Sequence, residues 1–158
     1  MIHKQAILDL ILAKLSSELE TLTRGARASF AAATDPDSKA ENKYDTRTLE
    51  ASYVARGQAQ RVAELDGAIR AFRALSGAEW PPGMAITTGA LVKLQTSADE
   101  SEHYYLGPSA GGTQVSHEGQ EILVITPSSP LGQKLIGKRA GARVELRPGH
   151  AVEVAAVR

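Results

Sequence analysis

The sequence contains no cysteine, which excludes disulfide bonds and thiolate metal sites. It also has no excess charge of either sign, because 18 Lys and Arg residues balance 18 Asp and Glu residues. This balance gives no electrostatic case for direct nucleic-acid binding, which normally needs a basic patch, but it is compatible with a protein partner. No apolar run is long enough to span a bilayer, and no signal peptide is recognisable. We therefore expect a cytoplasmic protein that does not contact a membrane.

Proline and glycine are scarce in the first half of the chain and concentrated in the second. Residues 79–158 hold six of the seven prolines and ten of the fourteen glycines. Gly77 is suited to the C-terminus of a helix, and Pro81-Pro82 cannot continue one. We therefore predict two domains, an elongated helical hairpin over residues 1–78 and a compact domain over residues 79–158.

The first half predicts two long helices that fold back on each other. In each helix, seam residues recur at alternating steps of three and four, which is typical of a coiled coil. The first seam contains Leu8, Leu12, Leu15, Leu19, Leu22, Ala26, Phe30 and Ala33, and the second contains Tyr44, Thr48, Ala51, Ala55, Gln58, Val62, Leu65, Ile69 and Phe72. A first helix of about 31 residues would be roughly 47 Å long. Antiparallel pairing with a turn near residues 34–37 favours a monomer, although the same seams can also pair between chains.

The second half predicts several strands and one short helix. Strands are expected at Leu91–Thr96, His103–Leu106 and Ile122–Ile125, over the alternating residues Ala142–Arg147, and on the return through Val152 and Val154. Between them, Ser129 can cap a helix, Pro130 can occupy its first position, and Gly137 can end it. Pro148-Gly149 predicts a type II turn. The predicted class is α+β, with an antiparallel sheet and one short helix.

The predicted turn between the two long helices is acidic. Asp37, Glu41 and Asp45 are four residues apart and would share one helix face, where like charges cost ~0.2–0.5 kcal/mol per pair. A divalent cation such as Mg²⁺ would relieve that repulsion, but one helix face cannot enclose a metal, so the ion would be held weakly or shared with a partner. The same segment also has a purely structural interpretation, because Ser38 and Glu41 form a Ser-x-x-Glu capping box and acids favour a first helical turn.

Two segments resemble the Gre family of bacterial transcript-cleavage factors. The first is Glu41-Asn42 within an acidic turn between two long helices. The second, more specific segment runs from Ile125 through Ser129-Pro130-Leu131-Gly132 to Gly137-Lys138, and is similar to the Ser-Pro and Leu-x-Gly-Lys segment of the Gre C-terminal domain. The resemblance extends over essentially the whole chain. It implies a coiled-coil finger followed by a globular domain whose sheet is like that of FK506-binding prolyl isomerases (FKBP-like).

The resemblance also implies a protein cofactor of bacterial RNA polymerase that is not an enzyme by itself. In this family the globular domain docks at the mouth of the polymerase's secondary channel, a role that corresponds here to Ser129, Pro130 and Leu131. The finger enters the channel and delivers acidic residues that help to hold a second Mg²⁺ and position a water. The polymerase then cuts the RNA 3′ end of a backtracked complex. The chain would therefore bind no cofactor alone and would share Mg²⁺ only within the complex.

The tip residues that match this role are Asp37, Glu41 and Asn42, with Asp37 and Glu41 as the ligands of the shared Mg²⁺. The tip Asp of the family normally lies three residues before the Glu, where this sequence has Ser38. The nearest acid, Asp37, lies four residues before it. Two functions stay open: stimulation of RNA cleavage, with the turn shifted by one residue at Pro36, or channel occupancy that inhibits or modulates transcription without cleavage.

Two other classes of function are weaker alternatives. The FKBP-like fold suggests prolyl isomerase activity, but such active sites are rich in aromatic residues, and beyond Trp80 the second half contains only Tyr104 and Tyr105. A coiled-coil adaptor that binds some other partner is the remaining alternative. The four histidines are scattered without metal-ligand spacing and are expected at the surface or in turns.

Overall fold

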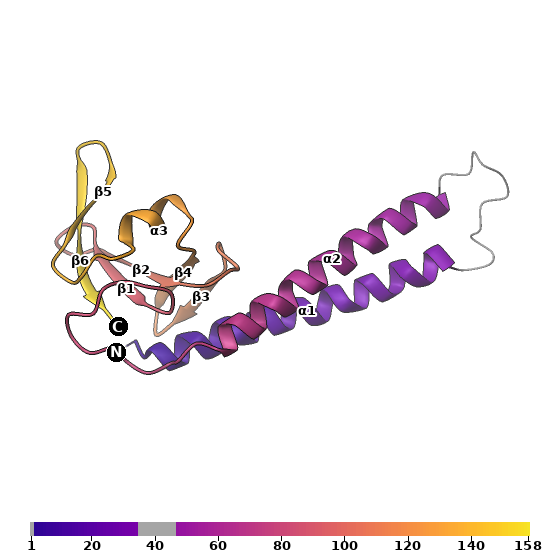
Figure 1. Ribbon diagram of the computed structural model, residues 1–158, viewed down its shortest axis with the longest axis horizontal. Helices are drawn as coiled ribbons and strands as arrows, with labels where there is room; N and C mark the ends of the chain where they lie inside the picture. The colour runs from indigo at the N-terminus through magenta and orange to yellow at the C-terminus, as the bar shows by residue number, and fades with distance from the viewer. Residues whose placement is uncertain (1, 35–46) are drawn as a thin grey trace. The chain divides into compact units, whose positions relative to one another are not determined.

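The structure is a computed structural model, and it describes residues 2–34 and 47–158 (Figure 1). These residues form two compact units, one spanning Lys14–Ile69 and the other joining the chain up to Ala13 with Arg70–Arg158. The predicted domain boundary between residues 78 and 79 follows composition, whereas the two units follow packing, so that boundary stays a prediction. Within the described ranges, no helix is both long and apolar enough to cross a membrane.

The first half of the chain forms α1 (Lys4–Thr34) and α2 (Arg47–Arg73). The length of α1, 31 residues, is as predicted from the run of seam residues. The contacts between the helices in the described part of the chain include the pairing of Arg61 with Glu18 at 3.2 Å and the approach of Gln58 to Gly25, where an added Cβ would lie 3.4 Å from the Gln58 Nε2. As the chain advances from Glu18 to Gly25, its partner moves back from Arg61 to Gln58. The predicted antiparallel pairing is therefore confirmed.

Within the helical unit, burial follows the predicted seam. Leu15 and Leu65 are both almost completely buried, and Leu19 and Val62 are half-buried. Gln58 is an exception among these apolar residues, because its amide oxygen is buried and has no hydrogen-bond partner within residues 2–34 and 47–158. A polar group left unpaired in a seam costs stability, so this position is a weak point of the hairpin.

The second half forms a six-stranded sheet with one short helix (Figure 1). The strands are β1 (Leu91–Gln95), β2 (Ser101–Leu106), β3 (Gln114–His117), β4 (Gln120–Ile125), β5 (Arg143–Arg147) and β6 (His150–Val157), and the helix is α3 (Pro130–Leu135). Their order across the sheet is β3-β4-β2-β1-β6-β5. The α+β class, with two long helices and a sheet that carries one short helix, is confirmed.

Two features of the sheet differ from the sequence-based expectation. β2 and β4 pair in parallel, whereas the other described strand pairs are antiparallel as predicted. β3 was not predicted, because Val115 is the single apolar residue of its Gln-Val-Ser-His sequence. β3 turns back through a two-residue hairpin into β4, and it is this hairpin that brings β4 alongside β2 in the same direction.

One face of the sheet carries a core built from alternating residues of the strands. The fully buried side chains on this face include Ile86, Val92, Leu94, Leu106, Leu135 and Val154. Leu135 comes from α3, so the short helix is held against this face by its own apolar residue. Arg143, Glu145 and Arg147 are exposed between the inward-facing residues of β5, which confirms the predicted half-buried strand.

The same unit contains a second packing region around Tyr105, which is completely buried. The rings of Phe72 and Tyr105 have centroids 6.2 Å apart. A Cβ on Gly107 would meet both Phe72 and Val124, so glycine is required where the chain leaves β2. The buried part of this unit therefore includes the end of α2 as well as the sheet.

Candidate docking site

The Ser-Pro segment starts α3, as the sequence predicts. The Ser129 backbone is extended (φ −68°, ψ 156°), its hydroxyl accepts a hydrogen bond from the Gly132 N–H at 3.0 Å, and Pro130 occupies the first turn. Both features stabilise a helix start, because the cap satisfies an otherwise unpaired N–H and proline has none to lose. Ile136 ends the helix, and Gly137 follows with a φ of +81°, which glycine adopts without strain.

Gly132 allows the helix to pack tightly against the end of β4. A Cβ at this position would overlap the carbonyl oxygen of Thr126. The Ser129 hydroxyl donates to the same carbonyl at 2.7 Å, and the Ser129 N–H also donates to it at 3.0 Å. The segment from Thr126 to Gly132 is thus a rigid corner that fixes where α3 begins.

The three residues predicted to dock on the polymerase differ in what they can offer a partner. Pro130 is exposed. Leu131 is half-buried against the core of the sheet. The hydroxyl of Ser129 is engaged within the chain, since it accepts from Gly132 and donates to Thr126. Ser129 and Leu131 therefore hold the corner in place, and Pro130 is the member of the set that is free to make contact.

A groove of about 560 Å³ lies between α3 and β5 and is strongly basic. Its charged lining consists of Lys134, Lys138, Arg143, Arg147 and Glu145. With four basic and one acidic side chain, the groove is positive in a chain whose formal net charge is zero. Its signal in the sequence is limited to the arginines at both ends of the exposed side of β5.

Two of the charged groups in the groove are already used by the fold. The Lys134 ammonium donates to the carbonyl oxygens of Glu145 and Leu146 at 2.9 and 3.0 Å, which ties α3 to β5. The Glu145 carboxylate accepts from the Gly149 N–H at 2.8 Å and so supports the turn. The other three cations of the groove are Lys138, Arg143 and Arg147. They are exposed and pair with no carboxylate among the described residues. A groove of this kind is complementary to an acidic surface.

The predicted tip site lies outside the described residues. Asp37, Glu41 and Asn42, and with them the predicted shared Mg²⁺ ligands, are therefore not placed by the structure. Residues 2–34 and 47–158 contain no group of three or more His, Asp or Glu residues positioned to hold a metal ion. The metal role of the tip stays a prediction from the sequence.

Comparison with known proteins gives limited information. No protein-family model and no curated protein matches the chain. Three solved structures are similar over nearly its whole length: the transcription factor Gfh1 (18% identity, 94% of each chain, TM-score 0.37), the GreA factor homolog 1 (Gfh1) protein of Thermus thermophilus (20%, 93% of this chain and 94% of that one, 0.37) and Thermus aquaticus Gfh1 (20%, 92% of each chain, 0.39).

Proposed function

We propose that this chain is a Gre-type accessory protein of RNA polymerase that docks through the start of α3 and acts through the tip of its helical hairpin. The observation that carries this proposal is the rigid Thr126–Gly132 corner, which presents Pro130 beside the basic groove. The antiparallel pairing of α1 and α2 also agrees with the Gre-like organisation that the sequence implies. The protein would modify a reaction that the polymerase performs, and would not be a catalyst itself.

The charge of the groove indicates the kind of surface that Pro130 would meet. Lys138, Arg143 and Arg147 lie on one patch and have no acidic partner in the described ranges, so a docking surface on the polymerase should carry carboxylates. Because these cations are exposed, their main contribution is to the rate of association, and it should weaken as salt screens them. Pro130 would add a rigid apolar contact that salt does not weaken.

The tip residues would then act inside the polymerase. We propose that Asp37 and Glu41 contribute carboxylate oxygens to a Mg²⁺ that the polymerase already holds in part, with Asn42 positioning the reacting groups. A two-metal reaction needs ligands and orientation at the second ion, and these are what a tip of this composition can supply. The RNA 3′ end would be contacted only within the complex.

A second function is favoured by one feature of the sequence. Asp37 lies four residues before Glu41, whereas the family pattern has an Asp three residues before it. If this shift misplaces the carboxylate, the hairpin would occupy the channel and inhibit or modulate synthesis without promoting cleavage. Docking through Pro130 is common to both functions, so the two differ only in what happens at the tip.

Docking is tested by measuring the affinity of the full-length chain for bacterial RNA polymerase core enzyme. Pro130→Ala should weaken binding by roughly tenfold, which is about 1.4 kcal/mol. The fold should tolerate this change, because the first helical position needs no proline. Arg143→Met with Arg147→Met should slow association at low salt, whereas Arg73→Met, an exposed cation at the end of α2, should not. Unchanged affinity in both groove and Pro130 variants would refute docking at this site.

The tip function is tested by RNA cleavage in defined backtracked elongation complexes. Wild-type protein is compared with Asp37→Ala and Glu41→Ala at saturating concentration. Cleavage stimulated by the wild type and lost in both variants would support the cofactor role. Retained binding without stimulation, together with slower RNA synthesis, would support channel inhibition. Absence of any polymerase binding would leave a coiled-coil adaptor as the better explanation.

A further inference from the structure

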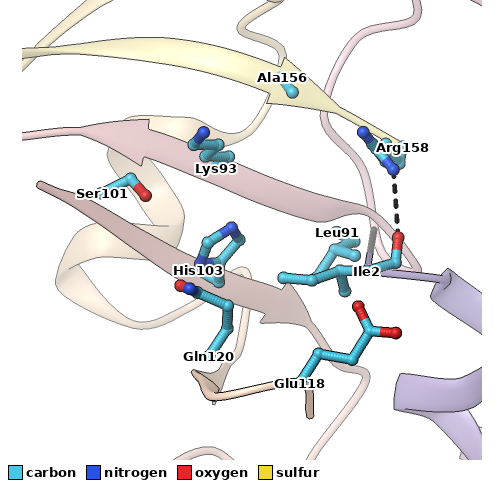
Figure 2. Close-up of a pocket in the computed structure, with 9 residues that line it drawn as sticks. All are labelled: Ile2, Leu91, Lys93, Ser101, His103, Glu118, Gln120, Ala156 and Arg158. Carbon is cyan, nitrogen blue, oxygen red and sulfur yellow. Dashed lines mark hydrogen bonds between the residues drawn. The ribbon is translucent and has the colours of Figure 1, made fainter. Parts of the chain in front are cut away.

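A second cavity, of about 330 Å³, lies in the sheet unit and is separate from the groove beside α3. Figure 2 shows its lining side chains, which come from β1, β2, the β3–β4 turn and the end of β6. Lys93, His103 and Gln120 gather along one part of the cavity, and Arg158 and Glu118 lie at the other part, beside Ile2. Its volume is at the lower end of the range for small-molecule sites.

The pairing of the strands explains why positive charge accumulates here. Lys93 on β1 is directly opposite His103 on β2 and Ala156 on β6. Arg158 follows β6, and its backbone pairs with that of Leu91 on β1. Three side chains that can carry positive charge therefore line one cavity, and all three are half-buried.

This arrangement is unfavourable for the protein alone. The pKa of His103 is lowered, first by burial and then by the positive charges of Lys93 and Arg158. The Arg158 guanidinium donates a hydrogen bond to the carbonyl oxygen of Ile2 at 3.1 Å, and its other N–H groups have no acceptor among the described residues. Lys93 forms no ion pair or hydrogen bond among the described residues. Half-buried cations of like sign are stabilised when an anion lies between them.

We propose that this cavity binds a phosphate group, free or carried by a small molecule, through the side chains of Lys93, His103 and Arg158. A phosphate presents several acceptor oxygens, which suits an ammonium, an imidazolium and a guanidinium that converge from different strands. Ser101 and Gln120 add neutral donors at the same cavity. The apolar wall formed by Ile2, Leu91 and Ala156 would accommodate the organic part of a phosphomonoester.

Glu118 is the acidic member of the lining and is held there by an unusual backbone conformation. Together with Gly119 it forms the turn between β3 and β4, and both residues have positive φ values, 50° and 76°. Such turns favour Asn-Gly or Asp-Gly, so glutamate at this position is strained. The N-terminal ammonium hydrogen-bonds this carboxylate and lowers its pKa, so the group stays ionised and its negative charge opposes an incoming anion. Glu118→Asn removes that charge and suits the turn.

The proposal is tested by NMR titration of the full-length protein, following the His103 imidazole resonance over about pH 5 to 7, a range that extends below the usual histidine pKa because the pKa of His103 is lowered. Inorganic phosphate and phenyl phosphate are added at constant ionic strength, balanced with chloride. Both should shift the resonance saturably, with a Kd of about 1 mM or below. Tighter binding of phenyl phosphate would identify a phosphomonoester as the ligand class, and equal affinities would identify free phosphate. Because the apparent affinity should follow protonation of His103, it should fall as pH rises, with Lys93 and Arg158 as the charged groups that act on the imidazole.

Two substitutions should change the affinity in opposite directions. Lys93→Met should raise the Kd by about fivefold or more, because it removes a charge-assisted hydrogen bond. Lys138→Met, the matched change in the groove beside α3, should leave it unchanged. Glu118→Asn should lower the Kd by roughly two- to fivefold. A shift that does not saturate, or equal affinities in the Lys93 and Lys138 variants, would overturn the proposal. If the NMR spectrum shows that Lys93→Met does not fold, the Glu118→Asn variant decides: failure of that change to lower the Kd would overturn the proposal. This site is independent of polymerase docking, and either can fail without the other.

Discussion

Lys4 is a buried cation whose removal should change how stability depends on pH. It is completely buried at the start of α1, and its ammonium lies 4.0 Å from the centroid of the Trp80 ring. That nitrogen has no hydrogen-bond partner in the part of the chain that the structure describes, although the backbone N–H of Lys4 donates to the Glu79 carboxylate at 3.1 Å. Burial lowers the pKa of Lys4 from 10.5 to about 8, and the charge of Glu79 offsets only part of this effect.

The size and sign of the effect follow from this pKa. At about 1.4 kcal/mol per pKa unit, a drop from 10.5 to about 8 corresponds to ~3 kcal/mol as an upper limit. Solvent screening and local relaxation reduce it, so we expect about 1–2 kcal/mol. Between pH 8 and pH 10.5 the unfolded chain keeps a proton that the folded chain has lost. The free energy of unfolding should therefore rise with pH across that window.

Lys4→Met keeps the volume of the side chain and removes its charge. At pH 7 the variant should be more stable than the wild type, because it no longer buries a charge. The wild type gains stability above pH 8 and the variant does not, so this difference in the free energy of unfolding should shrink by about 1–2 kcal/mol between pH 7 and pH 10. At pH 7 the net gain will be smaller than this, because the cation–π contact with Trp80, worth about 0.5–2 kcal/mol, is lost as well. Urea unfolding followed by far-UV circular dichroism measures both quantities.

The protonation of Lys4 can also be observed directly. Trp80 is the only tryptophan of the chain, so its fluorescence reports on the ammonium above its ring. The wild-type emission should titrate with a midpoint near pH 8, and this transition should be absent in Lys4→Met. Lys138→Met, an exposed lysine, should leave it intact. Parallel pH profiles of stability in the wild type and Lys4→Met, with no fluorescence transition in either, would refute the reasoning.

Three further changes test the packing, each measured by urea unfolding. Gly132→Ala should destabilise the protein by about 2–3 kcal/mol, because the added Cβ overlaps the Thr126 carbonyl. Gly57→Ala is the control: an added Cβ meets no atom within 4 Å there, so this change should stabilise the protein by ~0.5–1 kcal/mol. Equal effects of the two changes would contradict this account. Tyr105→Phe should be neutral or stabilising by up to ~1 kcal/mol, since the buried hydroxyl has no partner; a clear loss would reveal one. Gln58→Leu should stabilise the hairpin by about 1 kcal/mol, because it removes an unpaired amide oxygen, and a lower urea midpoint would argue for a role of this amide in helix register.

The sequence by itself determined the elements whose signals are local. The cap at Ser129, the proline after it and the glycine after Ile136 bound α3 in the structure as they do in the sequence. The spacing of the seam residues predicted both long helices, and the alternation along β5 predicted its buried and exposed sides. These predictions succeed because capping, helical periodicity and strand alternation depend on residues only a few positions apart.

The tertiary structure decided what depends on residues far apart in the chain. The parallel pairing of β2 with β4 follows from the hairpin of β3, which carries too little apolar character to be recognised. Lys4 became a buried cation only because Trp80, some 75 residues away, covers it. The sequence predicted the cap at Ser129, but the hydrogen bond that its hydroxyl donates to the Thr126 carbonyl depends on the tertiary structure.

The two basic sites show the same division. The net charge of zero gave no reason to expect a positive surface, because it sums over the whole chain. The fold separates the charges: β5 and α3 gather cations in one groove, and adjacent strands place Lys93 beside His103 in a cavity. Electrostatic interactions decay within nanometres in salt, so the local arrangement determines binding and the total does not. Sequence supplied the charged residues, and strand pairing supplied their proximity.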